Sequence, residues 1–204
     1  MILKSIAQIC KSSKQLQLIN DAGRQWIGTS EALYRVTGLP DLDTSSLCSM
    51  FDIPESKQGK MYIDSRSSAD FALDLQQRYE TVDIPLPTMK MQIAGEDCEV
   101  LYTSQGVRFM KSRYLKPLAD EIKEGMLQFH ERETKNGEVY IGITCGFFEL
   151  AFVMPIIPGD GNKEEIEMLY HAMQSTLTVQ EKIRQRKAEE SQEDNEDEGE
   201  QICL

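Results

Sequence analysis

One pattern at the start of this chain returns near its middle, and an internal repeat constrains a fold more strongly than composition does. Residues 2–40 can be aligned with residues 114–155 with only small gaps. In this alignment residues 23–28 fall on residues 137–142. We interpret the pattern as one unit, a helix followed by three strands, that is used twice. The alternative is that short amphipathic helices followed by hairpins look alike by chance.

The second copy has the clearest periodicity. Its predicted helix has apolar residues three and four positions apart, at Leu115, Leu118, Ala119 and Ile122. Its predicted strands alternate at Val139, Ile141 and Ile143, which places these side chains on one face of a sheet. Residues 147–153 are apolar at nearly every position, which predicts a strand covered on both faces. In the first copy, residues 2–11 are the matching helix, and Leu16 aligns with Leu127.

Length and charge divide the chain into three parts. At 204 residues, one domain of roughly 150 residues with a C-terminal extension is the natural expectation. We predict an α+β domain over residues 1–157, in which residues 41–98 are insertion-like because the repeat does not cover them. Within that segment we expect a short helix over residues 44–51, capped by Asp43, and another over residues 69–79.

Residues 158–187 are predicted to form a linker and an amphipathic helix that Asn162 caps. The stripe of this helix consists of Ile166, Leu169, Tyr170, Met173 and Leu177. Residues 188–204 are predicted to be a disordered acidic tail, because they offer almost nothing apolar to bury.

The net charge of −12 comes largely from that tail. Residues 189–200 hold eight of the 34 acidic residues and no base, so the rest of the chain has 26 acids against 22 bases. The folded part is therefore only mildly acidic. A basic surface of the kind that ordinary free-standing nucleic-acid binders carry is not a bulk property of this chain.

Residue types that carry catalysis or bind metals are sparse. The five cysteines are far apart and no pair has CxxC spacing, and there are only two histidines, His130 and His171. This pattern argues against a zinc site and against a disulfide framework. The sequence also lacks a phosphate-binding glycine loop and the common hydrolase motifs. We therefore expect a non-enzymatic protein without a metal or other cofactor.

No apolar run approaches the ~20 residues of a membrane-spanning helix. The first residues also lack the layout of a secretory signal. We expect a cytoplasmic protein with no membrane partner.

The second copy, FMKSRYLKPLADEI followed by strands that end in FFELAFVMP, resembles the C-terminal domain of the bacterial replicative DNA sliding clamp. The residues that carry this resemblance are Phe109, the pair Tyr114 and Leu115, and the closing run of Val153, Met154 and Pro155. Domains of that family consist of two helix-plus-strands units related by a pseudo-twofold axis. The resemblance covers residues 2–40 and about 100–157, and its motifs are short and mostly apolar.

The resemblance implies a role for four lysines. Clamp helices line a ring, and their cations face DNA phosphates without reading the base sequence. The repeat places Lys4 on Lys116 and Lys11 on Lys123, so these four are the expected DNA-facing residues. The alternative is an ordinary solvated helix face.

The family also binds partner proteins through short peptides in an apolar pocket beside the final strand. By resemblance, Val153, Met154 and Pro155 would border such a pocket. The expected partners are then duplex DNA, replication proteins and further copies of the chain.

The chain departs from the family in two ways. It has room for one domain where a bacterial clamp subunit has three, and its predicted helix and acidic tail extend past the usual end. The first hypothesis is a sliding-clamp-like processivity or docking factor in DNA replication, encoded by a phage or mobile element. The second is a protein-protein interaction or inhibitory module that uses its acidic tail and does not encircle DNA.

Overall fold

The computed structural model describes residues 1–68, 73, 75, 82–87, 89–134, 136–159 and 163–200. The chain has a mixed α+β architecture and divides into two units, residues 1–158 and 159–204. The helices of the first unit are α1 (Leu3–Ser13), α2 (Thr44–Met50), α3 (Glu55–Gln58), the 3₁₀ helix η2 (Ser112–Leu118) and α4 (Ala119–Lys123). Its strands are β1 (Gln15–Asp21), β2 (Arg24–Gly28), β3 (Ala32–Val36), β4 (Tyr62–Ser67), β5 (Val82–Ile84), β6 (Lys90–Ile93), β7 (Glu96–Thr103), β8 (Gly106–Lys111), β9 (Leu127–Glu133), β10 (Val139–Cys145) and β11 (Phe148–Val153).

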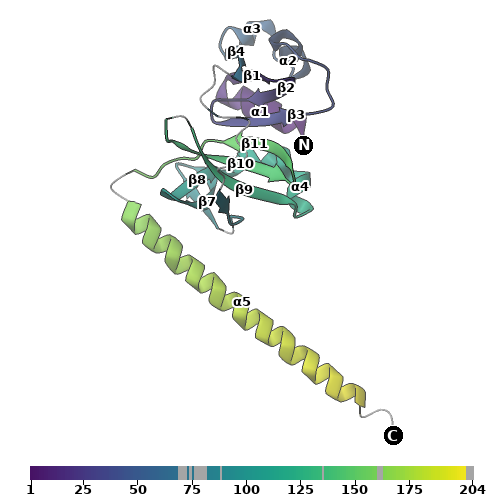
Figure 1. Ribbon diagram of the computed structural model, residues 1–204, viewed down its shortest axis with the longest axis vertical. Helices are drawn as coiled ribbons and strands as arrows, with labels where there is room; N and C mark the ends of the chain where they lie inside the picture. Colours follow the sequence, from purple (N-terminus) through teal and green to yellow (C-terminus); the bar gives the residue numbers. More distant parts are fainter. Residues whose placement is uncertain are drawn as a thin grey trace. The chain divides into compact units, whose positions relative to one another are not determined.

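The main sheet has eight strands in the order β4-β1-β2-β3-β11-β10-β9-β5. Strands β1 to β3 form one antiparallel meander, and β9 to β11 form another. The two meanders meet in the middle, where β3 and β11 pair antiparallel with Leu33 opposite Phe152. Figure 1 shows this arrangement, with the purple N-terminal strands on one side of the β3–β11 junction and the green strands on the other.

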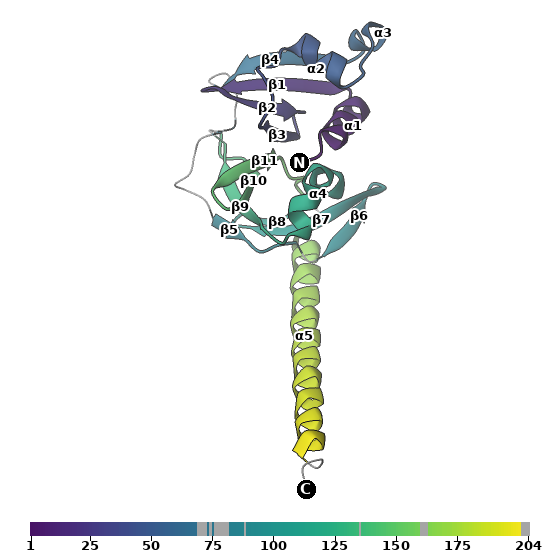
Figure 2. The same ribbon diagram turned by 90° about the vertical axis from the view of Figure 1, so that its right-hand side faces the viewer.

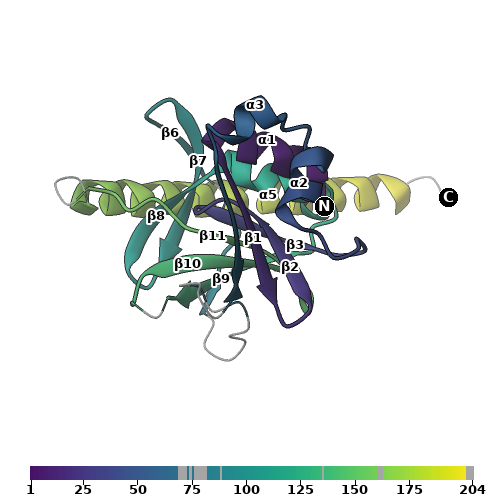
Figure 3. The same ribbon diagram turned by 90° about the horizontal axis from the view of Figure 1, so that it is seen from above.

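The segment between the repeats completes the sheet. Strand β4 pairs parallel with β1, and β5 pairs antiparallel with β9, so each forms one edge of the eight-stranded sheet. Strands β6, β7 and β8 form a separate antiparallel sheet (Figure 3). The predicted helix at residues 69–79 lies almost entirely outside the described residues.

Both predicted repeat helices are present, but in different forms. Helix α1 is regular, and its apolar positions Ile6, Ile9 and Cys10 are buried. The second helix is a 3₁₀ segment, η2, that continues into the five-residue α4. Pro117 lies within η2 and lacks an N–H, so a regular α-helical ladder is interrupted there. The predicted cap of α2 is confirmed, because the Asp43 carboxylate accepts a 2.7 Å hydrogen bond from the Ser46 backbone N–H.

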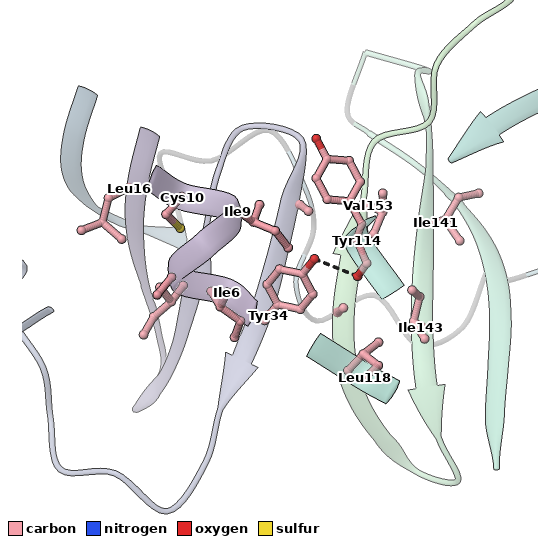
Figure 4. Close-up of a cluster of buried hydrophobic side chains, with 14 of the residues drawn as sticks. Ile6, Ile9, Cys10, Leu16, Tyr34, Tyr114, Leu118, Ile141, Ile143 and Val153 are labelled. Atoms are coloured by element: carbon pink, nitrogen blue, oxygen red, sulfur yellow. Dashed lines mark hydrogen bonds between the residues drawn. The ribbon is translucent and has the colours of Figure 1, made fainter. Parts of the chain in front are cut away.

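The helix-covered face of the sheet forms the larger hydrophobic core. α1 contributes Ile6, Ile9 and Cys10, and the second half of the unit contributes Leu118, Ile141, Ile143 and Val153 (Figure 4). The buried Tyr34 hydroxyl donates a 2.8 Å hydrogen bond to the Tyr114 carbonyl, which ties β3 to η2. One core therefore joins residues that are more than 100 positions apart in sequence.

A smaller cluster, which includes Trp26, Leu33, Tyr140 and Phe152, forms a second buried group. The rings of Trp26 and Phe152 stack with centroids 4.7 Å apart, and Tyr140 meets Phe152 edge to face at 5.7 Å. The prediction that residues 147–153 are covered on both faces is confirmed for Ala151, Phe152 and Val153. It is wrong for Phe147 and Phe148, which are 96% and 65% exposed because they lie at the turn between β10 and β11.

The second unit contains helix α5 (Lys163–Glu200). It continues beyond the end predicted near residue 187, and the residues it adds include helix-favouring glutamates and no proline. The predicted capping residue, Asn162, lies outside the described residues. The predicted disorder of residues 188–204 in solution stays a prediction. Among the described residues, no helix combines the length and apolar character that crossing a membrane requires.

Candidate nucleic-acid interface

The two repeat helices lie next to each other on one side of the main sheet (Figure 2). The Ile2 backbone N–H donates a 2.7 Å hydrogen bond to the Pro117 carbonyl, so the start of α1 is fixed against η2. The N-terminal ammonium of Met1 forms a 2.7 Å ion pair with Glu121 of α4. The helices whose lysines the sequence predicts to face DNA therefore share a face of the first unit.

Lys4 and Lys11 are exposed on α1 and line a common hollow of about 540 Å³. They are two helical turns apart, so they lie on the same side of the helix. The opposite wall of this hollow comes from the end of α2, with Met50, Phe51 and Asp52. Lys4 and Lys11, the two predicted DNA-facing lysines of the first repeat, thus border the same hollow between α1 and the end of α2.

A second hollow, of about 320 Å³, adjoins the first, since Lys11 and Asp52 line both. It adds Lys14, Lys57 and Lys60, over apolar side chains of Ile53 and Met61. We call the two hollows together the lysine trough, and its five cations are Lys4, Lys11, Lys14, Lys57 and Lys60. Asp52 is the single carboxylate among the residues that line it, so the trough carries a local excess of four positive charges.

Parallel pairing at the sheet edge brings Lys60 close to Lys14. β1 and β4 begin with Gln15 opposite Tyr62, and the Tyr62 N–H donates a 2.9 Å hydrogen bond to the Lys14 carbonyl. Lys14 itself ends α1 in the left-handed conformation, with φ of 55°. Lys57 lies in the short helix α3, which precedes β4. Three of the five trough lysines therefore depend on a long-range strand pairing.

Lys116 and Lys123 are exposed, but neither lines the trough. Lys116 borders a different hollow of about 490 Å³, whose lining is mostly apolar and includes Leu115, Ile122 and Phe129. Lys123 lies 3.9 Å from Asp120 in an exposed ion pair, which partly offsets its charge. The structure thus brings Lys4 and Lys11 together with further cations, and leaves the second pair of predicted lysines in a less positive setting.

The three residues predicted to border a peptide pocket differ in exposure. Val153 is fully buried in the larger core, between Ala32 and Ile141 of the neighbouring strands, so its side chain is not available to a partner. Met154 and Pro155 are partly exposed. The Met154 N–H donates a 2.8 Å hydrogen bond to the Glu31 carbonyl. Only Met154 and Pro155 keep the predicted location at an accessible surface.

His130 is a partly exposed residue of β9, which lies between β5 and β10 in the main sheet. Its Nδ1 is 2.8 Å from Asp83 Oδ1, and its Nε2 is 2.9 Å from Thr144 Oγ1. Asp83, His130 and Thr144 are thus connected in the order carboxylate, imidazole and hydroxyl, as in the catalytic triads of hydrolases. The Thr144 side chain is buried, however, so the hydroxyl is not open to a substrate. The arrangement is better explained as a hydrogen-bonded clip between β5, β9 and β10.

Within the described ranges, no group of three or more His, Cys, Asp or Glu side chains could hold a metal ion. The thiol of Cys10 is buried against the Gly28 carbonyl, and burial raises its pKa to about 12, so it is not a nucleophile near neutral pH. Comparison of the chain with models of protein families, with curated proteins and with solved structures found no match.

Proposed function

We propose that this chain is a non-enzymatic DNA-binding protein of the sliding-clamp type, which holds the backbone of duplex DNA in the lysine trough without reading its sequence. Its biological setting would be DNA replication, on a phage or mobile element, in the cytoplasm. The observation that carries the proposal is a pair of adjoining hollows lined by five lysines and one carboxylate, on a chain whose net charge is −12. Such a local reversal of charge is what attraction to phosphates requires.

The strand registers support the duplicated architecture that the proposal assumes. Ile27 pairs with Tyr34 and Ile141 pairs with Val153, while Gly28 pairs with Leu33 and Gly142 pairs with Phe152. The two hairpins therefore have the same local register around Gly28 and Gly142, the two glycines that the sequence alignment matches. An antiparallel pair at the centre, β3 with β11, is also the arrangement that a twofold relation between two such units gives.

The outer strands require one adjustment to the alignment. β1 pairs Gln17 with Gly28, whereas β9 pairs His130 with Gly142. Gln17 is thus equivalent to His130, and Leu16 to Phe129, which is two residues beyond Leu127, where the sequence alignment placed Leu16. The resemblance between the outer strands is carried by their position in the sheet and not by identical residues.

The spacing of the trough lysines suits a phosphate backbone. Lys4 and Lys11 are seven residues apart on α1, or about 10 Å along a helix axis. That distance corresponds to roughly three phosphates of one strand at 3.4 Å of rise each. Flexible ammonium groups contact phosphates as point charges, so such contacts would fix position and not base sequence.

In this proposal Lys116 and Lys123 contribute more weakly, from the second helix. A chain with one clamp domain needs several copies to surround a duplex, so self-association is part of the proposal. Docking of replication proteins by short peptides remains part of it too. The apolar hollow beside η2, with Leu115 and Ile122, offers the anchors that such peptides use, and Met154 and Pro155 offer a second accessible surface.

Binding of a labelled duplex, measured by fluorescence anisotropy at low salt, tests the proposal. Replacing two trough lysines, in Lys57→Gln/Lys60→Gln, should weaken binding at least tenfold. The matched control, Arg66→Gln/Lys90→Gln, removes two exposed cations that do not line the trough, and should change affinity less than twofold.

Equal losses in the two double variants would contradict the proposal, because they would indicate attraction by overall charge alone. The second hypothesis, an interaction module that uses the acidic tail, predicts another result. In that case duplex binding is absent even in a chain that lacks residues 188–204, whose removal changes the net charge from −12 to −4.

A further inference from the structure

The part of helix α5 that precedes the acidic run carries a stripe of residues at alternating spacings of three and four. This stripe consists of the apolar residues Ile166, Leu169, Met173 and Ile183 and the polar residues Thr176 and Gln180. Leu169 is 47% exposed, Met173 is 36% exposed and Ile183 is 49% exposed. A single helix with such a stripe is marginally stable in water, because tertiary or intermolecular packing supplies most helix stability.

The charges of this segment are separated along its length. Glu164 and Glu165 lie in its first turn and Glu167 follows directly after it, whereas Lys182, Arg184 and Arg186 lie about 20 residues further on. Two copies that pair in parallel would place acids beside acids and bases beside bases. Two copies that pair antiparallel would place the acidic end of each beside the basic end of the other, which is electrostatically complementary.

We propose that α5 associates with α5 of a second copy of this chain as an antiparallel helix pair. A register with Ile166 opposite Ile183 also places Leu169 opposite Gln180 and Met173 opposite Thr176. Each half of the stripe then faces the other half in the second copy, as a twofold axis near residues 174 and 175 requires. Glu165 and Arg186 flank the seam on the same side, where they form an ion pair between the copies.

The helix pair and the proposed DNA contacts involve different residues. It concerns residues 164–186, whereas the lysine trough belongs to the first unit. Loss of duplex binding in the trough variants would leave the helix pair unaffected. Loss of the helix pair would be measured directly as a fall in the molecular mass of the protein in solution.

Sedimentation velocity of the full chain at tens of micromolar tests the helix pair. The unaltered chain should sediment as a dimer, and Met173→Asp should raise the dissociation constant more than tenfold because it puts a charge in the seam. Met168→Asp is the matched control, since Met168 is 65% exposed and lies off the stripe, and it should leave the dissociation constant within twofold. Circular dichroism shows whether each variant keeps its fold.

Charge exchange then tests the orientation. Glu165→Arg alone and Arg186→Glu alone should each weaken the dimer several-fold, and the double variant should return it to within twofold of the unaltered chain. A monomeric unaltered chain, equal effects of Met168→Asp and Met173→Asp, or a double variant that is not restored would each overturn the proposal.

Discussion

At the scale of single residues, a contact centred on Glu31, just before β3, ties the N-terminal half of the first unit to β8 and η2. Its carboxylate is 2.7 Å from the Lys111 ammonium and accepts a hydrogen bond from the Tyr114 hydroxyl. Partial burial alone would raise the pKa of Glu31, but these two partners outweigh it and hold the pKa below its ordinary value of 4.5. Burial of Tyr114 and its hydrogen bond to Glu31 raise the pKa of the Tyr114 hydroxyl well above its ordinary value of 10.0.

Glu31→Gln should therefore destabilise the chain near neutral pH by about 0.5–1 kcal/mol, a small value because the carboxylate is about half exposed and screened by solvent. A lowered folded-state pKa means that the stabilisation is present above the unfolded-state pKa of about 4.3 and is lost as the pH falls through the lower folded value. Urea denaturation at a series of pH values should show the stabilities of the two proteins converging as the pH falls below the unfolded-state pKa of the carboxyl. A difference that stays constant as the pH falls would contradict this account. The exposed Glu124→Gln serves as the control.

At the scale of elements, the turn between β2 and β3 depends on the absence of a side chain at Gly28. A Cβ added there would lie 1.9 Å from the Ala32 carbonyl oxygen, which is backbone and cannot rotate away. The Thr29 N–H donates a 2.8 Å hydrogen bond to that same carbonyl, so the turn cannot open without losing this bond. Gly28 also matches Gly142 in the repeat, where the nearest atoms to an added Cβ would belong to the Arg132 side chain, the closest at 3.3 Å.

Gly28→Ala should destabilise the first unit by more than about 2 kcal/mol, because either the turn or the β2–β3 ladder must shift. Gly142→Ala should cost less, since a side chain can move where backbone cannot. Gly59→Ala meets nothing within 4 Å and should be nearly neutral. Thermal denaturation of the three variants gives the order, and a Gly28→Ala protein as stable as Gly59→Ala would contradict the turn geometry.

Local sequence patterns predicted most of the elements in the repeats. Alternation identified β10, apolar spacing of three and four identified α1, and the residue type of Asp43 identified the start of α2. The patterns failed where long-range or steric effects decide. Pro117 shortened the second helix into η2 and α4, and Phe147 and Phe148 proved to be exposed at a turn, although their apolar character resembles that of the buried strand they precede.

At the scale of the whole molecule, the sequence located part of the candidate site. The family resemblance and the repeat alignment singled out Lys4 and Lys11, and the structure places both along one hollow. Lys14, Lys57 and Lys60 had no such signal, because a parallel pairing between strands some 45 residues apart brings them together. Periodicity contains no information about that pairing, so a lysine in a polar loop is indistinguishable from an ordinary solvated residue until the sheet edge is known.

The central claim is that the trough lysines neutralise DNA phosphates, and the salt dependence of duplex binding measures this most directly. Each phosphate contact contributes about −0.9 to the slope of the logarithm of the binding constant against the logarithm of the salt concentration. Lys57→Gln/Lys60→Gln should therefore make the slope shallower by about 2 on duplexes of unrelated sequence, while Arg66→Gln/Lys90→Gln should leave it unchanged. A trough variant whose slope equals that of the unaltered chain would contradict the account.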